Sequence, residues 1–155
     1  MSAPDLAEPL RGWRAWRVTE TRAGLRLASV IYDDTWQPGK PFRATCRSAP
    51  HGAPGARCDC GIYASRSSFD AARYLIGRND PLVVHRVVGV VRLWGVVFEG
   101  SRGWRAEIAY PERVWVPQVS AAGEIARLLG VYGIPVEGVA ARPGAGVASE
   151  IAALT

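Results

Sequence analysis

The chain has 155 residues, of which 48% are hydrophobic and 21% are charged, and its formal net charge is +5. This length suits one domain that buries roughly two thirds of its surface on folding, and the composition excludes a disordered protein. Eighteen of the nineteen basic residues are arginine, which indicates either an anion-binding surface or GC-rich coding. They are scattered and never form a run of four, so no nucleic-acid footprint is evident.

Targeting and membrane signals are weak in this sequence. The longest nearly uncharged run, residues 82–98, contains His85, Arg86 and Arg92, so it cannot cross a bilayer as a helix. The first nine residues have neither the positive region nor the apolar region of a signal peptide, which predicts a cytoplasmic location. In a reducing compartment, an odd number of clustered cysteines favours metal or thiol chemistry over disulfides.

The N-terminal half predicts short strands separated by turns. Residues 12–18 and 25–32 alternate apolar with polar or small side chains, and the turn before Gly24 predicts that they pair as a hairpin. Around them we expect a flexible lead at 1–11, a loop at 33–39, a strand at 42–46 and a helix at 67–76 with Ser67 or Ser68 as its N-cap.

The C-terminal half predicts a long strand, a hairpin and one strong helix. Residues 82–98 are rich in valine and favour a strand that bends at Gly89 and Gly95. A turn at 99–103 leads to a second strand. The remaining expected elements are a strand at 104–110 broken by Pro111, an edge piece at 114–117, a helix at 119–129 capped by Ser120, a return strand at 132–136, and a loosely held tail at 138–155 with a short helix at 147–154.

One four-residue segment occurs twice in the sequence. The segment Gly12-Trp-Arg-Ala15 recurs as Gly103-Trp-Arg-Ala106, although the flanking residues do not match. We interpret it as two similar hairpin strands, with coincidence as the alternative.

All three cysteines and one histidine fall within fifteen residues, at Cys46, His51, Cys58 and Cys60. Three thiolates and one imidazole are the ligand set of a closed tetrahedral zinc site, provided that the chain turns at Gly61. An iron–sulfur cluster is the alternative cofactor. A cluster without metal, or catalysis by a cysteine with a histidine, is the alternative role.

A second group of residues predicts a ligand-binding face. If the strands around Trp94 and residues 104–110 pair, then Arg105, Glu107 and Tyr110 approach Trp94 or His85, and Arg105 and Glu107 share one face of their strand. An aromatic wall with one arginine and one glutamate suits a small polar ligand. The alternative is that the tryptophans belong to the core and the charged pair lies on the surface. His85, in the valine-rich strand, is expected to be a hydrogen-bonded structural side chain.

Several short motifs of this chain occur together in one known group of proteins. They are Trp36-x-Pro-Gly39, Cys46 to His51-x-x-Pro54, Cys58-x-Cys60-Gly-Ile-Tyr-Ala64, Leu93-Trp-Gly95 and Gly103-Trp-Arg-Ala-Glu-x-Ala-Tyr-Pro111. On these motifs the chain resembles a family of small uncharacterised proteins of actinobacteria and their phages. The resemblance spans residues 12–136 and implies a common fold and the four-ligand set, but no activity.

Together these patterns predict an α+β protein with one globular domain at residues 12–137. We expect a curved, mostly antiparallel sheet or small open barrel, one or two helices and a zinc-stapled loop. The function favoured is a non-enzymatic binding or adaptor module whose tryptophan- and arginine-rich face recognises a protein or a small molecule, without a membrane partner. The alternatives are a nucleic-acid-binding protein and a cysteine-dependent enzyme or iron–sulfur redox protein.

Overall fold

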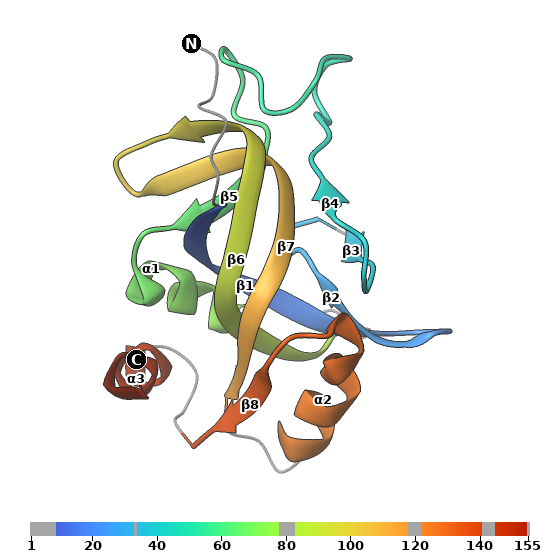
Figure 1. Cartoon of the computed structure of the whole chain (residues 1–155), viewed down its shortest axis with the longest axis vertical. Helices are drawn as coiled ribbons and strands as arrows, with labels where there is room; N and C mark the ends of the chain where they lie inside the picture. Colours follow the sequence, from blue (N-terminus) through green and yellow to red (C-terminus); the bar gives the residue numbers. More distant parts are fainter. Residues whose placement is uncertain (1–8, 33, 78–82, 118–121, 141–144, 155) are drawn as a thin grey trace.

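The computed structural model of the chain describes residues 9–32, 34–77, 83–117, 122–140 and 145–154, to which our structural statements refer (Figure 1). The strands form one sheet: β1 (Leu10–Thr21), β2 (Gly24–Ala28), β3 (Thr35–Trp36), β4 (Phe42–Arg43), β5 (Ile62–Ser65), β6 (Val83–Glu99), β7 (Gly103–Pro117) and β8 (Val136–Val139). The helices are α1 (Ser68–Ala72), α2 (Ala122–Leu129) and α3 (Ala145–Leu154), with 3₁₀ turns at Arg73–Leu75 and Gly130–Tyr132. Within the described residues, no helix is long and apolar enough to cross a membrane.

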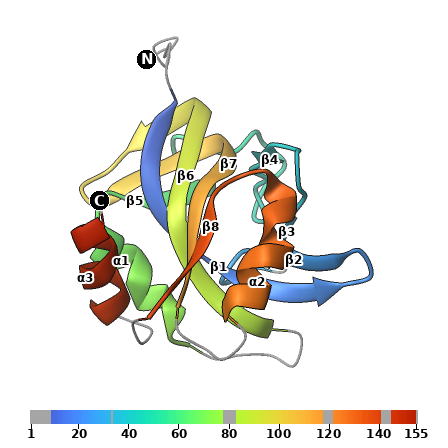
Figure 2. The same ribbon diagram turned by 60° about the horizontal axis from the view of Figure 1, so that its bottom comes forward.

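Three long strands curl the sheet into a partial ring. β6 lies between β1 and β7 and is antiparallel to both (Figures 1 and 2). On the other side, β5 pairs with both β1 and β7, so β1, β6, β7 and β5 follow one another around the ring. Every strand pair is antiparallel except β7 with β8. The curved, mostly antiparallel sheet predicted from the alternating segments is therefore confirmed.

The two Gly-Trp-Arg-Ala segments have the same structural role, on either side of β5. A Cβ atom on Gly12 would lie 2.6 Å from the Cβ atom of Ala64, and one on Gly103 would lie 2.0 Å from the carbonyl oxygen of Ala64. Only glycine leaves room for β5 at these distances. The two glycines therefore allow β5 to lie between β1 and β7.

Both predicted hairpins are present, but β2 ends at Ala28 and does not continue to residue 32. The predicted bend at Gly95 is a bulge, where the register of β6 against β7 shifts and Gly95 has φ +76°. Gly89 lies where a Cβ atom would collide with the carbonyl oxygen of Arg113, at 1.9 Å. The strand therefore needs Gly89 for close backbone approach, whereas Gly95 allows the bend.

The predicted break at Pro111 is wrong, because β7 continues to Pro117. A register shift leaves Glu112 as an extra residue between two β7 residues that pair with β6. On the opposite edge, the pairs with β4 end at Ala109 and those with β8 begin at Val114, so the missing N–H of Pro111 interrupts no ladder. Residues 114–117 are consequently not an edge piece, since all four pair with β8, and Val114 and Trp115 also pair with β6.

The segment predicted as a loop at 33–39 contains the two-residue strand β3. Trp36 is fully buried and stacks on Phe42, with 4.7 Å between the ring centroids. Burial of this large ring fixes the segment against β2 despite its turn-forming neighbours. In the part of this loop that is described, Tyr110 also accepts a hydrogen bond from the N–H of Gly39.

The described helices differ in extent from the predicted ones. Ser67 caps α1 as expected and accepts a hydrogen bond from the N–H of Phe69, but the α-helix ends at Ala72 and continues as a 3₁₀ turn. The predicted N-cap Ser120 lies outside the described residues. The return strand was expected at residues 132–136, but this segment begins inside the 3₁₀ turn Gly130–Tyr132. The observed return strand is β8, at Val136–Val139.

The C-terminal segment is packed and is not the loosely held tail that we expected. Val147, Ala148 and Ile151 of α3 are fully buried and share a core cluster with Trp115 and α1. These apolar side chains, spaced for one face of a helix, override the Ala- and Gly-rich composition of the segment. At the other end, Leu10 and Arg11 of the expected flexible lead belong to β1.

Candidate metal centre and the adjoining groove

The loop between β4 and β5 brings the four predicted metal ligands together. The ligand atoms of Cys46, His51, Cys58 and Cys60 all lie within 4.8 Å of one another. The sulfur atoms of Cys46 and Cys58 are 3.7 Å apart. A tetrahedron with metal–sulfur bonds of about 2.3 Å has edges of about 3.8 Å. The spacing of these two thiols therefore matches that of two ligands on one ion.

The sheet sets the positions of the two arms of this loop. β4 precedes Cys46 and β5 follows Cys60, and both strands pair with β7. Inside the loop, an isolated bridge joins Thr45 to Gly52. These pairs bring the Cys46 arm beside the arm that carries Cys58 and Cys60 without any metal contact.

Two glycines allow the ligands to approach one another. A Cβ atom on Gly55 would lie 2.5 Å from Cε1 and 3.0 Å from Nδ1 of the His51 ring. Gly61 has φ +129°, which favours glycine, and a Cβ atom there would lie 3.1 Å from Cβ atoms of Pro54 and Arg105. The turn that we expected at Gly61 is therefore present.

Arg105 holds the loop from the side of β7. Its guanidinium donates hydrogen bonds to the carbonyl oxygens of Gly55 at 2.8 Å and of Cys60 at 2.9 Å. It also lies over the ring of Phe98, 4.8 Å from the centroid. Arg105 was predicted as a ligand-binding residue, and its hydrogen bonds instead go to the loop that carries the metal ligands.

The three cysteines form no disulfide with one another, and the surroundings of their thiols differ. Hydrogen bonds, first from the backbone N–H of Cys60 and then from the Cys46 thiol, lower the pKa of Cys58. Burial raises the pKa of Cys60, although the N–H of Gly55 donates to its sulfur at 3.2 Å. Of these two thiols, Cys58 is therefore the one that loses its proton more readily when the cluster takes up a cation.

His85 is not part of this cluster. It is half-buried in β6, and its Nε2 lies 3.1 Å from the carbonyl oxygen of Pro117. This contact is that of the hydrogen-bonded structural histidine expected from the sequence.

The other residues predicted to bind a ligand do not meet in one place. Trp94 and Tyr110 line a shallow hollow of about 630 Å³, where the Tyr110 hydroxyl donates to the carbonyl oxygen of Tyr132. Glu107 instead accepts a hydrogen bond from the N–H of Val96 at the bulge of β6. No ion pair joins Glu107 to Arg105 among the described residues, so the predicted four-residue face is divided.

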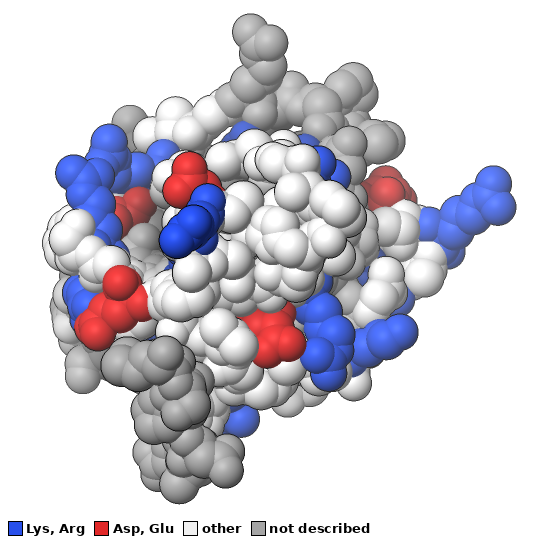
Figure 3. All heavy atoms as spheres, turned by 90° about the horizontal axis from the view of Figure 1, so that it is seen from above, with Lys and Arg blue, Asp and Glu red and all other residues white. Residues whose placement is uncertain are grey.

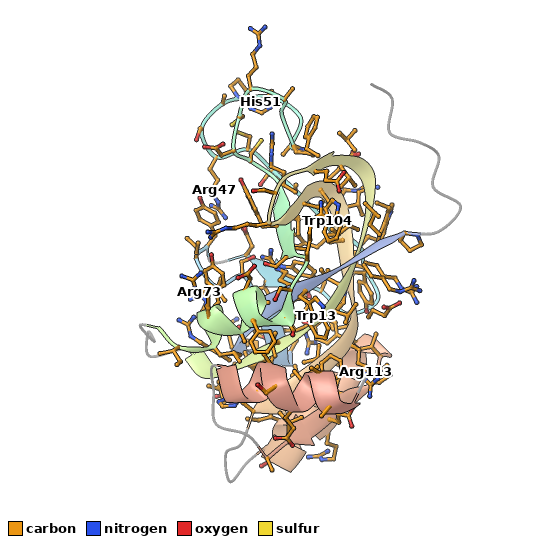
Figure 4. All side chains as sticks on the ribbon, turned by 90° about the vertical axis from the view of Figure 1, so that its left-hand side faces the viewer. Trp13, Arg47, His51, Arg73, Trp104 and Arg113 are labelled. Atoms are coloured by element: carbon orange, nitrogen blue, oxygen red, sulfur yellow. The ribbon has the colours of Figure 1, made fainter. Side chains whose placement is uncertain are left out.

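A larger groove, which the sequence did not predict, lies beside the cysteine loop. Its volume is about 1390 Å³, and its walls come from that loop, β1, β5, α1 and the turn between β6 and β7. Five exposed apolar or aromatic side chains line it: Ile31, Tyr32, Tyr63, Tyr74 and Ile76. In Figure 4, His51, Arg47 and Arg73 follow one another down the side of the molecule where the groove runs.

Charge on the surface is mixed. Figure 3 shows the Lys and Arg side chains of one face in separate small groups, with Asp and Glu side chains between them. The groove is also close to balanced in charge, with five basic and four acidic side chains: Arg14, Arg47, Arg73, Arg102 and Arg105, and Asp34, Asp59, Asp70 and Glu99. Such a surface differs from the continuous basic stripe typical of proteins that bind duplex nucleic acid.

Comparison of the chain with protein-family models, curated proteins and solved structures finds no match. The resemblance stated from the sequence motifs therefore stays a prediction.

Proposed function

We propose that Cys46, His51, Cys58 and Cys60 hold one zinc ion in a closed tetrahedral site. Nδ1 of His51 lies 2.8 Å from the carbonyl oxygen of Gly52. A carbonyl only accepts, so this hydrogen bond puts the proton on Nδ1 and leaves the lone pair on Nε2 for a metal. Three thiolates with one imidazole suit zinc, which would act here as a structural ion.

We further propose that the protein is a non-enzymatic binding module whose ligand lies in the groove. The observation that supports this most is the distribution of exposed apolar side chains. Ten large hydrophobic side chains are exposed among the described residues, and five of them line this one groove. Clustered apolar side chains around a hollow mark a binding site more often than chance exposure does.

The metal and the groove are connected through the same loop. Cys46, Cys58, Cys60 and Gly61 line the groove as well as carrying or adjoining the ligand set. A zinc ion would therefore fix one wall of the groove, and loss of the ion would release that wall. This connection favours a structural metal that supports recognition over a metal that acts on a substrate.

A single-stranded nucleic acid is the second candidate ligand. Arg47 lies over the ring of Tyr32, 4.3 Å from its centroid, at the edge of the groove. Exposed rings beside arginine can stack bases. The four acidic side chains that line the groove oppose a polyanion, however, so a small molecule or a peptide is the preferred ligand.

The groove is tested by a fragment screen on the ¹⁵N-labelled, zinc-loaded protein, with chemical shifts of backbone amides as the readout. We expect the shifts to cluster at the groove, and Tyr74→Ala to weaken binding. Val131→Ala is a matched control, because Val131 is 50% exposed like Tyr74 but lies outside the groove lining. Shifts spread over other surfaces, or equal effects of the two variants, would refute the proposal.

Two simple measurements distinguish zinc from an iron–sulfur cluster and a small molecule or peptide from a nucleic acid. A brown protein with visible absorption would assign the cluster to iron–sulfur chemistry. Retardation of labelled single-stranded DNA or RNA that weakens steeply with salt would assign the groove to nucleic acid.

A further inference from the structure

Arg14 lies on the groove side of β1 and is held there by two hydrogen bonds. Its Nη1 donates to the carbonyl oxygen of Tyr63 at 2.7 Å, and its Nη2 donates to Oγ of Ser29 at 3.3 Å. The guanidinium also lies 5.2 Å from the centroid of the Trp36 ring. Arg14 therefore has a fixed position in the lining of the groove.

The charge of Arg14 has no carboxylate partner among the described residues. The nearby acid, Asp34, forms its ion pair with Arg47 at 2.5 Å. Several other arginines of the sheet and its turns do have such partners: Arg11 and Arg92 bind Glu112, Arg66 binds Glu99, and Arg113 binds Glu137. Arg105, by contrast, uses its hydrogen bonds to hold the carbonyl oxygens of the cysteine loop. Arg14 differs from the ion-paired arginines because its two acceptors are both uncharged.

Burial makes this unpaired charge unfavourable. The Nε atom of Arg14 is buried and has no hydrogen-bond partner. Burial lowers the pKa of Arg14 to about 10, although Asp34 and then Tyr74 oppose this shift. A guanidinium carries five N–H donors, and the hydrogen bonds to Tyr63 and Ser29 use two of them, one on each Nη atom.

We infer that Arg14 is the anion-binding residue of the groove and that the ligand presents a carboxylate or a phosphate to it. This inference rests on the proposed function of the groove as a binding site. Guanidinium groups bind both oxyanions in the same bidentate way. The exposed rings of Tyr63 and Tyr74, each about half exposed, would then contact an apolar or aromatic body of the ligand.

The alternative is that Arg14 only ties β1 to Ser29 and to β5. A tie of this kind needs its two neutral acceptors and gains nothing from an added anion. The two roles therefore predict different responses to ligands that have the same shape but differ in charge.

The test titrates the ¹⁵N-labelled, zinc-loaded protein with benzoate, phenyl phosphate and the uncharged benzamide. We expect at least one anion to bind at the groove amides about tenfold more tightly than benzamide, and the better anion identifies carboxylate or phosphate chemistry. Arg14→Gln should abolish this preference while benzamide binding is retained. Arg22→Gln, an exposed arginine in the turn between β1 and β2, is the control and should keep the preference.

Arg14→Lys keeps the charge but loses the bidentate geometry, so it should retain only part of the preference for the anion over benzamide. This variant replaces Arg14→Gln in the test if Arg14→Gln does not fold. Equal binding of benzamide and both anions by the wild-type protein would refute the role of Arg14 and leave the groove as a binding site. A preference that survives in Arg14→Gln would also refute it. The absence of shifts at the groove with all three probes would refute both proposals.

Discussion

Replacing Arg105 with methionine should lower the free energy of unfolding of the zinc-loaded protein by about 3 kcal/mol. Methionine keeps an apolar chain over Phe98 but removes the donors to the carbonyl oxygens of Gly55 and Cys60. Each hydrogen bond from a charged donor contributes roughly 1.5–3 kcal/mol, and we take the lower value because Arg105 is half-buried. Two such bonds give about 3 kcal/mol.

The assay is urea unfolding followed by tryptophan fluorescence, before and after removal of the metal by a chelator. Chelation should release the loop in both proteins, so the difference between wild type and Arg105→Met should shrink to below about 1 kcal/mol. Arg22→Met provides the control, because Arg22 is exposed in a turn and its loss should change stability by less than about 0.5 kcal/mol. A loss for Arg105→Met that is equal before and after chelation would refute the connection between Arg105 and the metal loop.

Three further substitutions test separate parts of the structure. Gly55→Ala should lower zinc affinity by at least about tenfold in competition with a chromogenic chelator, because its Cβ atom would collide with the His51 ring. Tyr132→Phe should lower the free energy of unfolding by about 2 kcal/mol in urea, because the buried hydroxyl donates to one backbone group and accepts from another. Glu112→Gln should lower stability by about 1 kcal/mol at pH 7 and by progressively less in acid, as measured by urea unfolding across pH.

The sign of the Glu112 effect follows from its pKa. Burial raises this pKa, but hydrogen bonds from Arg11 and Arg92 outweigh burial and bring it below the ordinary value of 4.5. The folded protein therefore binds this proton less tightly than the unfolded chain does, so the stabilisation is complete above the ordinary value and is lost as pH falls through the folded-state pKa. A difference between wild type and Glu112→Gln that grows in acid would contradict this assignment.

The other two variants have matched controls. Gly52→Ala lies in the same loop as Gly55→Ala, but its Cβ atom would meet nothing within 4 Å, so zinc affinity should not change. Tyr74→Phe removes a hydroxyl from an exposed ring and should leave stability unchanged. Equal zinc affinities of the two glycine variants, or equal stabilities of Tyr74→Phe and Tyr132→Phe, would show that these contacts are not formed as described.

The metal cluster could be predicted from the sequence because its information is local. Cys46, His51, Cys58 and Cys60 are close in the chain, and their residue types alone define a ligand set. Alternation of apolar residues likewise predicted β1, and the richness in valine predicted β6, because both patterns are properties of each strand by itself.

The features that were missed depend on residues far apart in the chain. Pro111 looks like a strand terminator until the neighbours of β7 are known, since only then does its missing N–H fall between two ladders. Arg105 is fifty residues from Gly55, and nothing local distinguishes a residue that binds this loop from one that binds a ligand. The apolar spacing of Val147 and Ile151 was a usable signal for a packed α3, but it was outweighed by the composition of its neighbours.

The sequence contained only a weak indication of the groove. Tyr63 alternates with the buried residues Ile62 and Ala64, so strand periodicity places its large ring on the side away from the core. An aromatic residue on an outward face is a hint of recognition, but the sequence does not say which other outward residues share its surface.

The most direct test of the proposed zinc site is native mass spectrometry of the purified wild-type chain and of the Cys58→Ser variant. We expect one zinc ion per wild-type chain, and an unfolded or metal-free Cys58→Ser protein, because loss of one thiolate opens the site. A folded wild-type chain without bound metal, or a Cys58→Ser chain that keeps its zinc and its stability, would contradict a zinc ion held by these four residues.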